Sequence, residues 1–169
     1  MKLLSSIGLL TFFLLISCSN PAENPAETKE LINGLMNNWH KAAADARLEE
    51  YIRFMDKNSI YIGTDANEIW TRDSFNLFCK PYFAKGTTWD FKTIERNVYL
   101  DKKNKTAWFD ELLKTKMGVC RGSGILIFKK EQWRLKHYVL SMTIPNDVSK
   151  IVTVEKMNWD SLFIAGKMN

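Results

Sequence analysis

The chain has 169 residues, and 46% of them are hydrophobic, including ten phenylalanines, six tryptophans and five tyrosines. This length and composition suit one domain with a well-packed core and leave too little chain for a second. The formal charge of +5 comes from scattered basic residues that do not gather on one helix face, which argues against nucleic-acid binding.

Residues 1–17 have the pattern of a secretory signal peptide, because Lys2 supplies a positive start and an apolar run at 3–16 follows it. This run is too short for a comfortable membrane-spanning helix, which needs roughly 20 apolar residues. The sequence Leu-Ile-Ser-Cys at 15–18 resembles the lipobox of bacterial lipoproteins, whose cysteine is acylated before cleavage. We therefore predict that Cys18 carries a lipid that anchors the chain in a membrane. An uncleaved N-terminal anchor is the alternative.

Residues 18–28 are polar, contain two prolines and show no apolar periodicity, so the predicted lipid site is expected to be followed by a flexible tether. The predicted location is the cell envelope, with the domain outside the cytoplasm, and export is a second argument against a nucleic-acid partner. Ser19, directly after the lipid site, favours the outer membrane over the inner one under the common sorting rule.

Apolar residues at spacings of three and four predict helical structure over residues 29–56, with Thr28 as N-cap and a short second helix at 48–55. Residues 60–62 predict a brief strand. A further helix is expected at 72–83, and the proline late in it should end or bend it.

From Trp89 onward the apolar period changes to two, which predicts strands separated by hairpin turns. The four expected strands are 89–100, 106–117, 119–129 and 132–143. Helices followed by a meander of long strands indicate an α+β domain, with helices packed on one face of a curved sheet. The domain is expected over 29–148, and residues 149–169 are expected to form a helical C-terminal tail.

Several short motifs then resemble the SnoaL-like branch of the nuclear transport factor 2 superfamily through their order and spacing. They are Ile-Gly-Thr-Asp at 62–65, Glu-Ile-Trp at 68–70, Ala-Trp-Phe-Asp at 107–110, Arg-Gly-Ser-Gly at 121–124, Trp-Arg at 133–134, His-Tyr at 137–138, Ser141 and Ile-Pro-Asn at 144–146. The chain departs from the pattern at Thr71, where a glycine would be expected. The resemblance implies a cone-shaped barrel, in which a strongly curved antiparallel sheet is closed by about three N-terminal helices around a cavity. It leaves function open, because this fold hosts enzymes, binding proteins and oligomerisation domains.

Asp110 is the first candidate for chemistry, because alternation places it on the same strand face as Trp108. An apolar wall disfavours the charged form of a carboxylate, and such tuning makes a cavity acid or base. Ketosteroid isomerase, which belongs to the same superfamily, uses carboxyl groups in an apolar pocket in this way. The competing interpretation is a structural ion pair between Asp110 and Arg121.

His137 is predicted to face inward, because strict alternation puts it on the same side as Trp133 and Leu135. It is expected either to be a hydrogen-bonded core residue or to partner Asp110 in proton transfer. Arg121 is a candidate clamp for a carboxylate ligand, with an ion pair to Glu68 or Asp110 as the alternative.

The remaining ligand-binding candidates are Glu68 and Trp70, which the resemblance places near the cavity rim, together with Tyr61, Trp108 and Ser141. Phosphate-loop, nucleophile-elbow and metalloprotease motifs are missing from the sequence, so no cofactor and no metal is expected. Cys79 and Cys120 are expected to be either a disulfide or two buried thiols.

The sequence therefore favours a membrane-tethered domain that binds a small, partly apolar molecule, anionic if Arg121 contacts it, without an established activity. One alternative is a cavity enzyme of the isomerase, dehydratase or hydrolase type that uses Asp110 and His137. The other is a dimerisation or assembly module that pairs through its open sheet face, and a homodimer is the expected state, since dimers are common in the superfamily.

Overall fold

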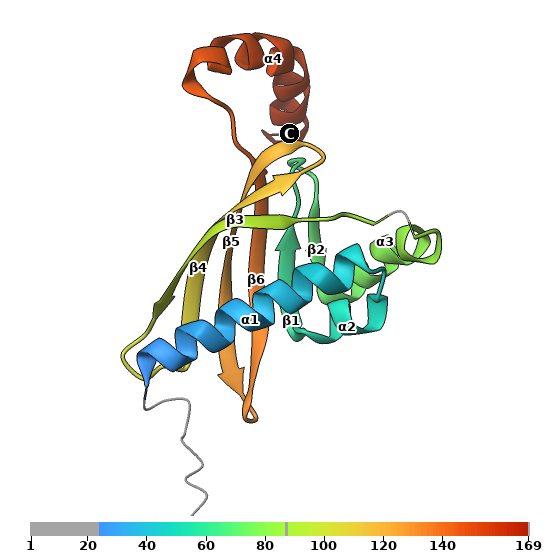
Figure 1. Cartoon of the computed structure of the whole chain (residues 1–169). Helices are drawn as coiled ribbons and strands as arrows, with labels where there is room; N and C mark the ends of the chain where they lie inside the picture. Colours follow the sequence, from blue (N-terminus) through green and yellow to red (C-terminus); the bar gives the residue numbers. More distant parts are fainter. Residues whose placement is uncertain (1–23, 87, 169) are drawn as a thin grey trace, which may run out of the picture.

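The computed structural model describes residues 24–86 and 88–168 and contains four helices and six strands in these ranges. The helices are α1 (Pro25–Ala44), α2 (Leu48–Arg53), α3 (Arg72–Ala84) and α4 (Asn146–Met168). The strands are β1 (Met55–Ile62), β2 (Ile69–Thr71), β3 (Lys92–Leu100), β4 (Thr106–Thr115), β5 (Gly118–Lys129) and β6 (Gln132–Met142). Figure 1 shows α1 crossing one face of the sheet, with α2 and α3 at one side of it.

The six strands form one sheet in the order β2-β1-β6-β5-β4-β3. The α+β class is confirmed, and the predicted meander corresponds to β3–β6. Four of the five strand pairs in the described residues are antiparallel as expected, and β1 pairs in parallel with β6. The strand β1 precedes the meander β3–β6 in the chain. The last strand of the meander, β6, lies beside β1 and runs in the same direction.

The first helix begins earlier than the sequence predicts. The side chain of Asn24 accepts hydrogen bonds from the backbone amides of Ala26 and Glu27, and Pro25 occupies the first turn, where its missing N–H costs nothing. Thr28, predicted as the N-cap, is instead buried inside the helix. The last residues of the predicted tether therefore belong to the folded domain.

The helix α3 lies within one residue of its predicted range. Its N-cap is Thr71, the residue at which the chain departs from the family pattern. Thr71 Oγ1 accepts a hydrogen bond from the Ser74 amide at 3.3 Å and so caps α3. Pro81 does not end this helix, which continues to Ala84.

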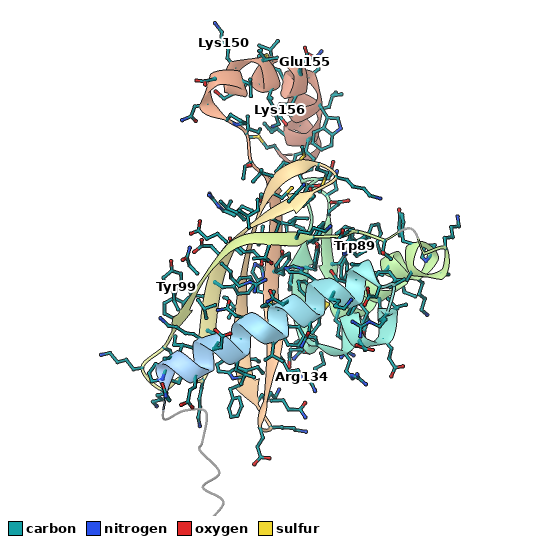
Figure 2. The ribbon with its side chains drawn as sticks, in the orientation of Figure 1. Trp89, Tyr99, Arg134, Lys150, Glu155 and Lys156 are labelled. Carbon is teal, nitrogen blue, oxygen red and sulfur yellow. The ribbon has the colours of Figure 1, made fainter. Side chains whose placement is uncertain are left out.

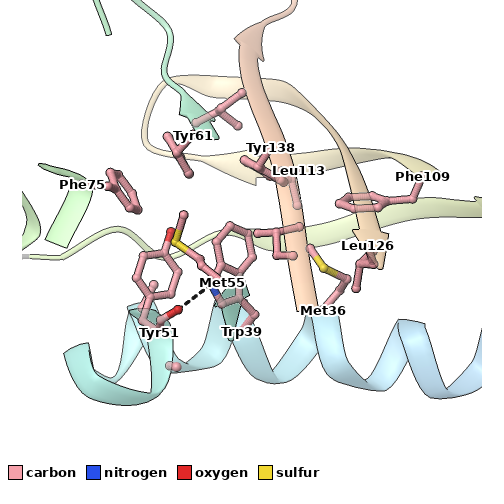
Figure 3. Close-up of a cluster of buried hydrophobic side chains, with 14 of the residues drawn as sticks. Met36, Trp39, Tyr51, Met55, Tyr61, Phe75, Phe109, Leu113, Leu126 and Tyr138 are labelled. Carbon is pink, nitrogen blue, oxygen red and sulfur yellow. Dashed lines mark hydrogen bonds between the residues drawn. The ribbon is translucent and has the colours of Figure 1, made fainter. Parts of the chain in front are cut away.

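The hydrophobic core lies between the first three helices and the face of the sheet that they cover, here called the inner face (Figure 3). On β4 this face carries Ala107, Phe109, Glu111 and Leu113, all of them buried. The indole Nε1 of Trp39 donates a hydrogen bond to the carbonyl oxygen of Tyr51 at 3.0 Å, which ties α1 to α2 inside this core. The core is rich in aromatic rings, and the Trp39 ring also stacks on the Tyr51 ring with centroids 4.8 Å apart.

The C-terminal helix stands apart from this core. None of the described side chains of α4 is buried, and Figure 1 shows the helix beyond the ends of the strands, at the opposite end of the sheet from the start of α1. Within residues 24–86 and 88–168, we find no helix long and apolar enough to span a membrane.

Cys79 and Cys120 are both buried and both free, so the disulfide left open by the sequence does not form. Burial raises the pKa of the Cys79 thiol to about 12. This thiol is therefore protonated at neutral pH and is part of the core rather than a reactive group.

Candidate functional site

A pocket of about 380 Å³ opens between α3, the loop from β1 to β2, the segment that precedes β3, and the turn from β4 to β5. This volume lies in the range of small-molecule sites. Its lining includes Tyr61, Gly63, Glu68, Trp70, Phe75, Phe78, Tyr82, Trp89, Asp90, Phe91, Lys116 and Leu140. Two other grooves on the described surface are lined mainly by charged and polar side chains, and a third, between α1 and α2, holds only about 180 Å³. The aromatic pocket is therefore the strongest candidate for an organic ligand.

The helix α3 supplies one wall of the pocket through regular spacing. Phe75, Phe78 and Tyr82 follow one another at three and four residues and so lie on one face of the helix. Trp70, from the short strand before this helix, stacks on Phe78 with ring centroids 4.6 Å apart. Tyr61 from β1 stacks on Phe75 at 4.1 Å, which joins the wall to the core.

Trp89 completes the aromatic wall and was not identified as a site residue from the sequence. Its ring lies 6.5 Å from Phe78 and 6.4 Å from Tyr82, and its Nε1 donates to the hydroxyl oxygen of Tyr51 at 3.2 Å. The sequence placed Trp89 at the start of a strand, whereas the strand begins only at Lys92 (Figure 2 shows Trp89 beside α3).

Glu68 holds a fixed position at the rim of the pocket. Its Oε2 accepts a hydrogen bond from the backbone amide of Asp65 at 3.2 Å. Gly63 lies directly against the same side chain, and a Cβ at that position would collide with Oε2. A side chain at position 63 would therefore push the Glu68 carboxylate away from the Asp65 amide.

The pocket also carries a second acidic group and one basic group. Asp90 is exposed and lies 3.4 Å from the Nζ of Lys92, while Lys116 is exposed on the turn between β4 and β5. At the inner end, burial raises the pKa of Tyr61 above its usual range, and nearby Cys79, Glu68 and Glu111 add to this effect. The Tyr61 hydroxyl is therefore a neutral hydrogen-bonding group.

A buried ionic cluster around Glu111 lies deeper in the domain, and no sequence motif predicts it. Glu111 Oε1 accepts hydrogen bonds from His40 Nε2 and from the Tyr138 hydroxyl, each at 2.9 Å. Glu111 Oε2 lies 2.7 Å from Arg96 Nη2 and 2.9 Å from Arg96 Nε. The same guanidinium donates to Asn37 on α1, so the cluster fastens this helix to the sheet.

Asp110 and Trp108 do not face the pocket, and the predicted orientation of this pair is wrong. They lie on the face of the sheet opposite the core, here called the outer face, where Trp108 stacks on Tyr99 and Asp110 accepts a hydrogen bond from Asn97 at 3.3 Å. The side chains of β4 alternate between the two faces as predicted, but both faces carry apolar residues. The sequence therefore could not decide which face the helices cover.

His137 also lies on the outer face, because β6 does not alternate strictly. Ile125 pairs with His137 and Leu126 pairs with Leu135, so Lys136 is an extra residue that forms a β-bulge. The bulge shifts the phase of the strand by one residue. As a result Leu135 and Tyr138 both point inward, and the predicted inward direction of His137 is wrong.

Arg121 and Ser141 pair with each other across β5 and β6 on the same outer face. Both are exposed, and neither lines the pocket. Within residues 24–86 and 88–168, Arg121 forms neither of the expected ion pairs with Glu68 and Asp110. Of the predicted site residues, the structure thus brings together Tyr61, Glu68 and Trp70 in one pocket and places the other five on the opposite face.

The proposed acid–base pair is consequently not assembled around the pocket. In the part of the chain that the structure describes, no three His, Cys, Asp or Glu side chains lie close enough together to hold a metal ion. What the pocket offers is a concave aromatic surface with two carboxylates and one ammonium group at its rim.

The fold is shared with bacterial proteins of low sequence identity. An NTF2-like protein of unknown function from Pseudomonas putida KT2440 is 13% identical, with a TM-score of 0.62 over 74% of this chain and 92% of that one. An NTF2-like protein from Cytophaga hutchinsonii is 10% identical, with a TM-score of 0.58 over 68% and 98%. A cystatin-like domain of unknown function from Nostoc punctiforme is 8% identical, with a TM-score of 0.62 over 86% and 100%.

These similarities establish the fold alone, and no curated protein matches the sequence. The family model of the SnoaL-like domain matches residues 32–145, from the second turn of α1 to the end of the sheet. This match covers well over half of the sequence and leaves only α4 and the N-terminal region outside it. The chain therefore belongs to the SnoaL-like domain family, within the NTF2-like fold.

Proposed function

We propose that this domain binds a small, partly apolar molecule in the aromatic pocket beside α3. The observation that carries the proposal is an aromatic wall whose rings remain partly exposed, although the core residues beside it are buried. The wall consists of Trp70, Phe78, Tyr82 and Trp89. Aromatic side chains that stay accessible in a concave site lose water when a ligand enters, and this favours binding.

We further propose that the domain works at the bacterial cell envelope, held by a lipid on Cys18. This cysteine lies outside the described residues, and the support comes from the signal-like sequence that precedes it. Because α1 already begins at Pro25, the intervening segment would reach only about 20 Å at ~3.4 Å per extended residue. Such a tether would hold the domain close to the membrane, with α4 at its far end (Figure 1).

Native mass spectrometry of the full-length protein in a non-ionic detergent tests the binding proposal. We expect a bound mass that leaves on denaturation and that is lost in Phe78→Ala, which opens the aromatic wall. The matched control is Trp108→Ala, which removes an aromatic ring from the outer face and should keep the bound mass. A ligand retained equally by both variants would show that binding occurs elsewhere. The same spectra test the anchor, because Cys18→Ser should lack the mass of the acyl chains.

A second function, homodimerisation, is favoured by the outer face of the sheet. Tyr99 pairs with Trp108 and Trp108 pairs with Ile125, so three large apolar side chains lie side by side on β3, β4 and β5. They are 42%, 46% and 38% exposed. Adjacent exposed apolar residues on a flat face are typical of an interface between protein chains.

Light scattering after size exclusion tests this second proposal. We expect a dimer that becomes a monomer in Trp108→Glu, because a charge cannot be buried without a partner. Leu77→Glu, on the exposed side of α3, is the matched control and should remain dimeric. A monomer at all concentrations of the unchanged protein would contradict the proposal.

A further inference from the structure

We infer that the aromatic pocket prefers a ligand carrying an alkylated ammonium group. This inference rests on the proposed binding function and adds the charge and chemical class of the ligand. It reverses the expectation of an anionic ligand, which depended on Arg121.

The first observation is the arrangement of the rings at the pocket. Trp70, Phe78, Tyr82 and Trp89 follow one another with centroid distances of 4.6, 5.2 and 6.4 Å, and none of the four is fully buried. The face of an aromatic ring carries partial negative charge and attracts cations, most strongly for tryptophan. Several partly exposed rings around one cavity are the arrangement that recognises a methylated ammonium group.

The second observation is the balance of charge in the lining. Glu68 and Asp90 contribute two carboxylates, whereas Lys116 is the only basic residue that lines the pocket in the described part of the chain. Glu68 is half-buried and is held in place by the Asp65 amide. Lys116 lies exposed on a turn, where water screens its charge.

The third observation is the absence of an anion clamp among the described lining residues. The lining contains no arginine, and Arg121 lies on the outer face of the sheet. The Oε2 of Glu68 already accepts a backbone amide, while we find no hydrogen-bond partner for its Oε1 within residues 24–86 and 88–168. A carboxylate with one oxygen available beside aromatic faces provides a charge partner for a cation and repels an anion.

Three small probes of nearly equal shape and different charge test the inference: choline, 3,3-dimethylbutan-1-ol and 3,3-dimethylbutanoate. Binding to the full-length protein in a non-ionic detergent is measured by calorimetry at fixed ionic strength, and the indole N–H signals of Trp70 and Trp89 report the place of binding by NMR. We expect choline to bind about tenfold more tightly than the neutral alcohol, and the anion to bind most weakly.

Glu68→Gln separates charge from shape, because glutamine keeps the size of the side chain. We expect this variant to lose most of the preference for choline and to bind the neutral alcohol unchanged. Glu95→Gln, on the outer face, is the control and should keep the preference.

The inference is overturned if the neutral alcohol or the anion binds as tightly as choline, or if Glu68→Gln leaves the preference intact. It is also overturned if none of the probes shifts the Trp70 and Trp89 signals. Each of these outcomes leaves the proposed binding function to be judged separately, by the Phe78→Ala mass-spectrometry experiment. If Phe78→Ala loses the bound mass but calorimetry shows no preference for choline, the pocket binds a ligand and that ligand is not a cation.

Discussion

Two neighbouring carboxylates on β4 have opposite surroundings, although they differ by one position in the sequence. Glu111 is 1% exposed and accepts hydrogen bonds from His40, Arg96 and Tyr138. Asp110 lies half-buried on the outer face, where it accepts a hydrogen bond from Asn97 at 3.3 Å. A buried charge is tolerated only when donors surround it, so the burial of Glu111 depends on three other elements of the fold.

We predict that Glu111→Gln destabilises the domain by about 3–5 kcal/mol, because Arg96 is 3% exposed and would lose its buried counter-ion. Asp110→Asn is the matched control on the same strand and should change the free energy of unfolding by less than about 0.5 kcal/mol. Urea denaturation of both variants measures the difference. Equal effects in the two variants would show that the buried cluster does not stabilise the fold.

The pH dependence of stability follows from the same cluster. Burial by itself would raise the pKa of Glu111, but hydrogen bonds and charge from His40 and Arg96 outweigh it and hold this pKa below its ordinary value of 4.5. The folded state therefore takes up this proton less readily than the unfolded state, and the cluster stabilises the fold fully only above pH 4.5.

We accordingly expect the difference in unfolding free energy between the unchanged protein and Glu111→Gln to be constant near neutral pH. It should shrink as the pH falls below 4.5, through the lowered pKa of the folded state. Urea denaturation series at several pH values measure it. A difference that grows toward acidic pH would mean that the pKa of Glu111 is raised in the folded protein.

At the scale of the strand, the bulge at Lys136 decides which side chains of β6 face the core. Leu135 precedes the bulge and Tyr138 follows it, and both are fully buried. The Nζ of Lys136 donates to the carbonyl oxygen of Asn58 at 2.7 Å and lies 3.4 Å from Asp56. The bulge is therefore also tied to β1, the strand that pairs with β6 in parallel.

Deleting Lys136 should prevent native folding, because one half of β6 would have to turn its buried residues outward. Lys136→Ala keeps the length of the strand and removes one donor from the buried carboxylate of Asp56, which still accepts the Asn58 amide, so it should cost about 1–3 kcal/mol and keep the native fold. Near-UV circular dichroism and thermal unfolding compare the two variants. A deletion variant with native spectra would show that β6 can shift its register without loss.

At the scale of the whole molecule, the family domain and the C-terminal helix are distinct. The SnoaL-like match ends at Pro145, and α4 follows directly, with none of its described side chains buried. Trp159 and Phe163 stack on each other at 5.4 Å within the helix. The helix therefore adds little to the stability of the domain, and its internal packing is local.

We predict that a chain ending at Pro145 unfolds with nearly the same free energy as the full chain, within about 0.5 kcal/mol, because no described side chain of α4 is buried. Chemical denaturation of the two forms measures it. The core variant Leu135→Ala is a positive control and should cost about 2–5 kcal/mol. A large loss on truncation would indicate that α4 packs against the domain in solution.

Local periodicity along the chain was enough to predict most of the helices and strands. Spacings of three and four predicted the helices near α1 and α3, and alternation predicted β3–β6 with errors only at the ends. The order of short motifs then identified the family. Among the pocket residues, Glu68 and Trp70 were placed at the cavity by the resemblance, and Tyr61 was a further candidate from the sequence.

Only the tertiary structure decided which faces point inward and which residues meet. Alternation gives the two faces of a strand but does not say which one the helices cover, so Asp110 was assigned inward in place of Glu111. A bulge of one residue reversed His137, because an extra residue shifts every later side chain to the other face. Trp89 lies in the pocket because the chain after α3 turns back against this helix and against Tyr51 of α2. These features depend on contacts between segments far apart in the chain, and no local pattern contains them.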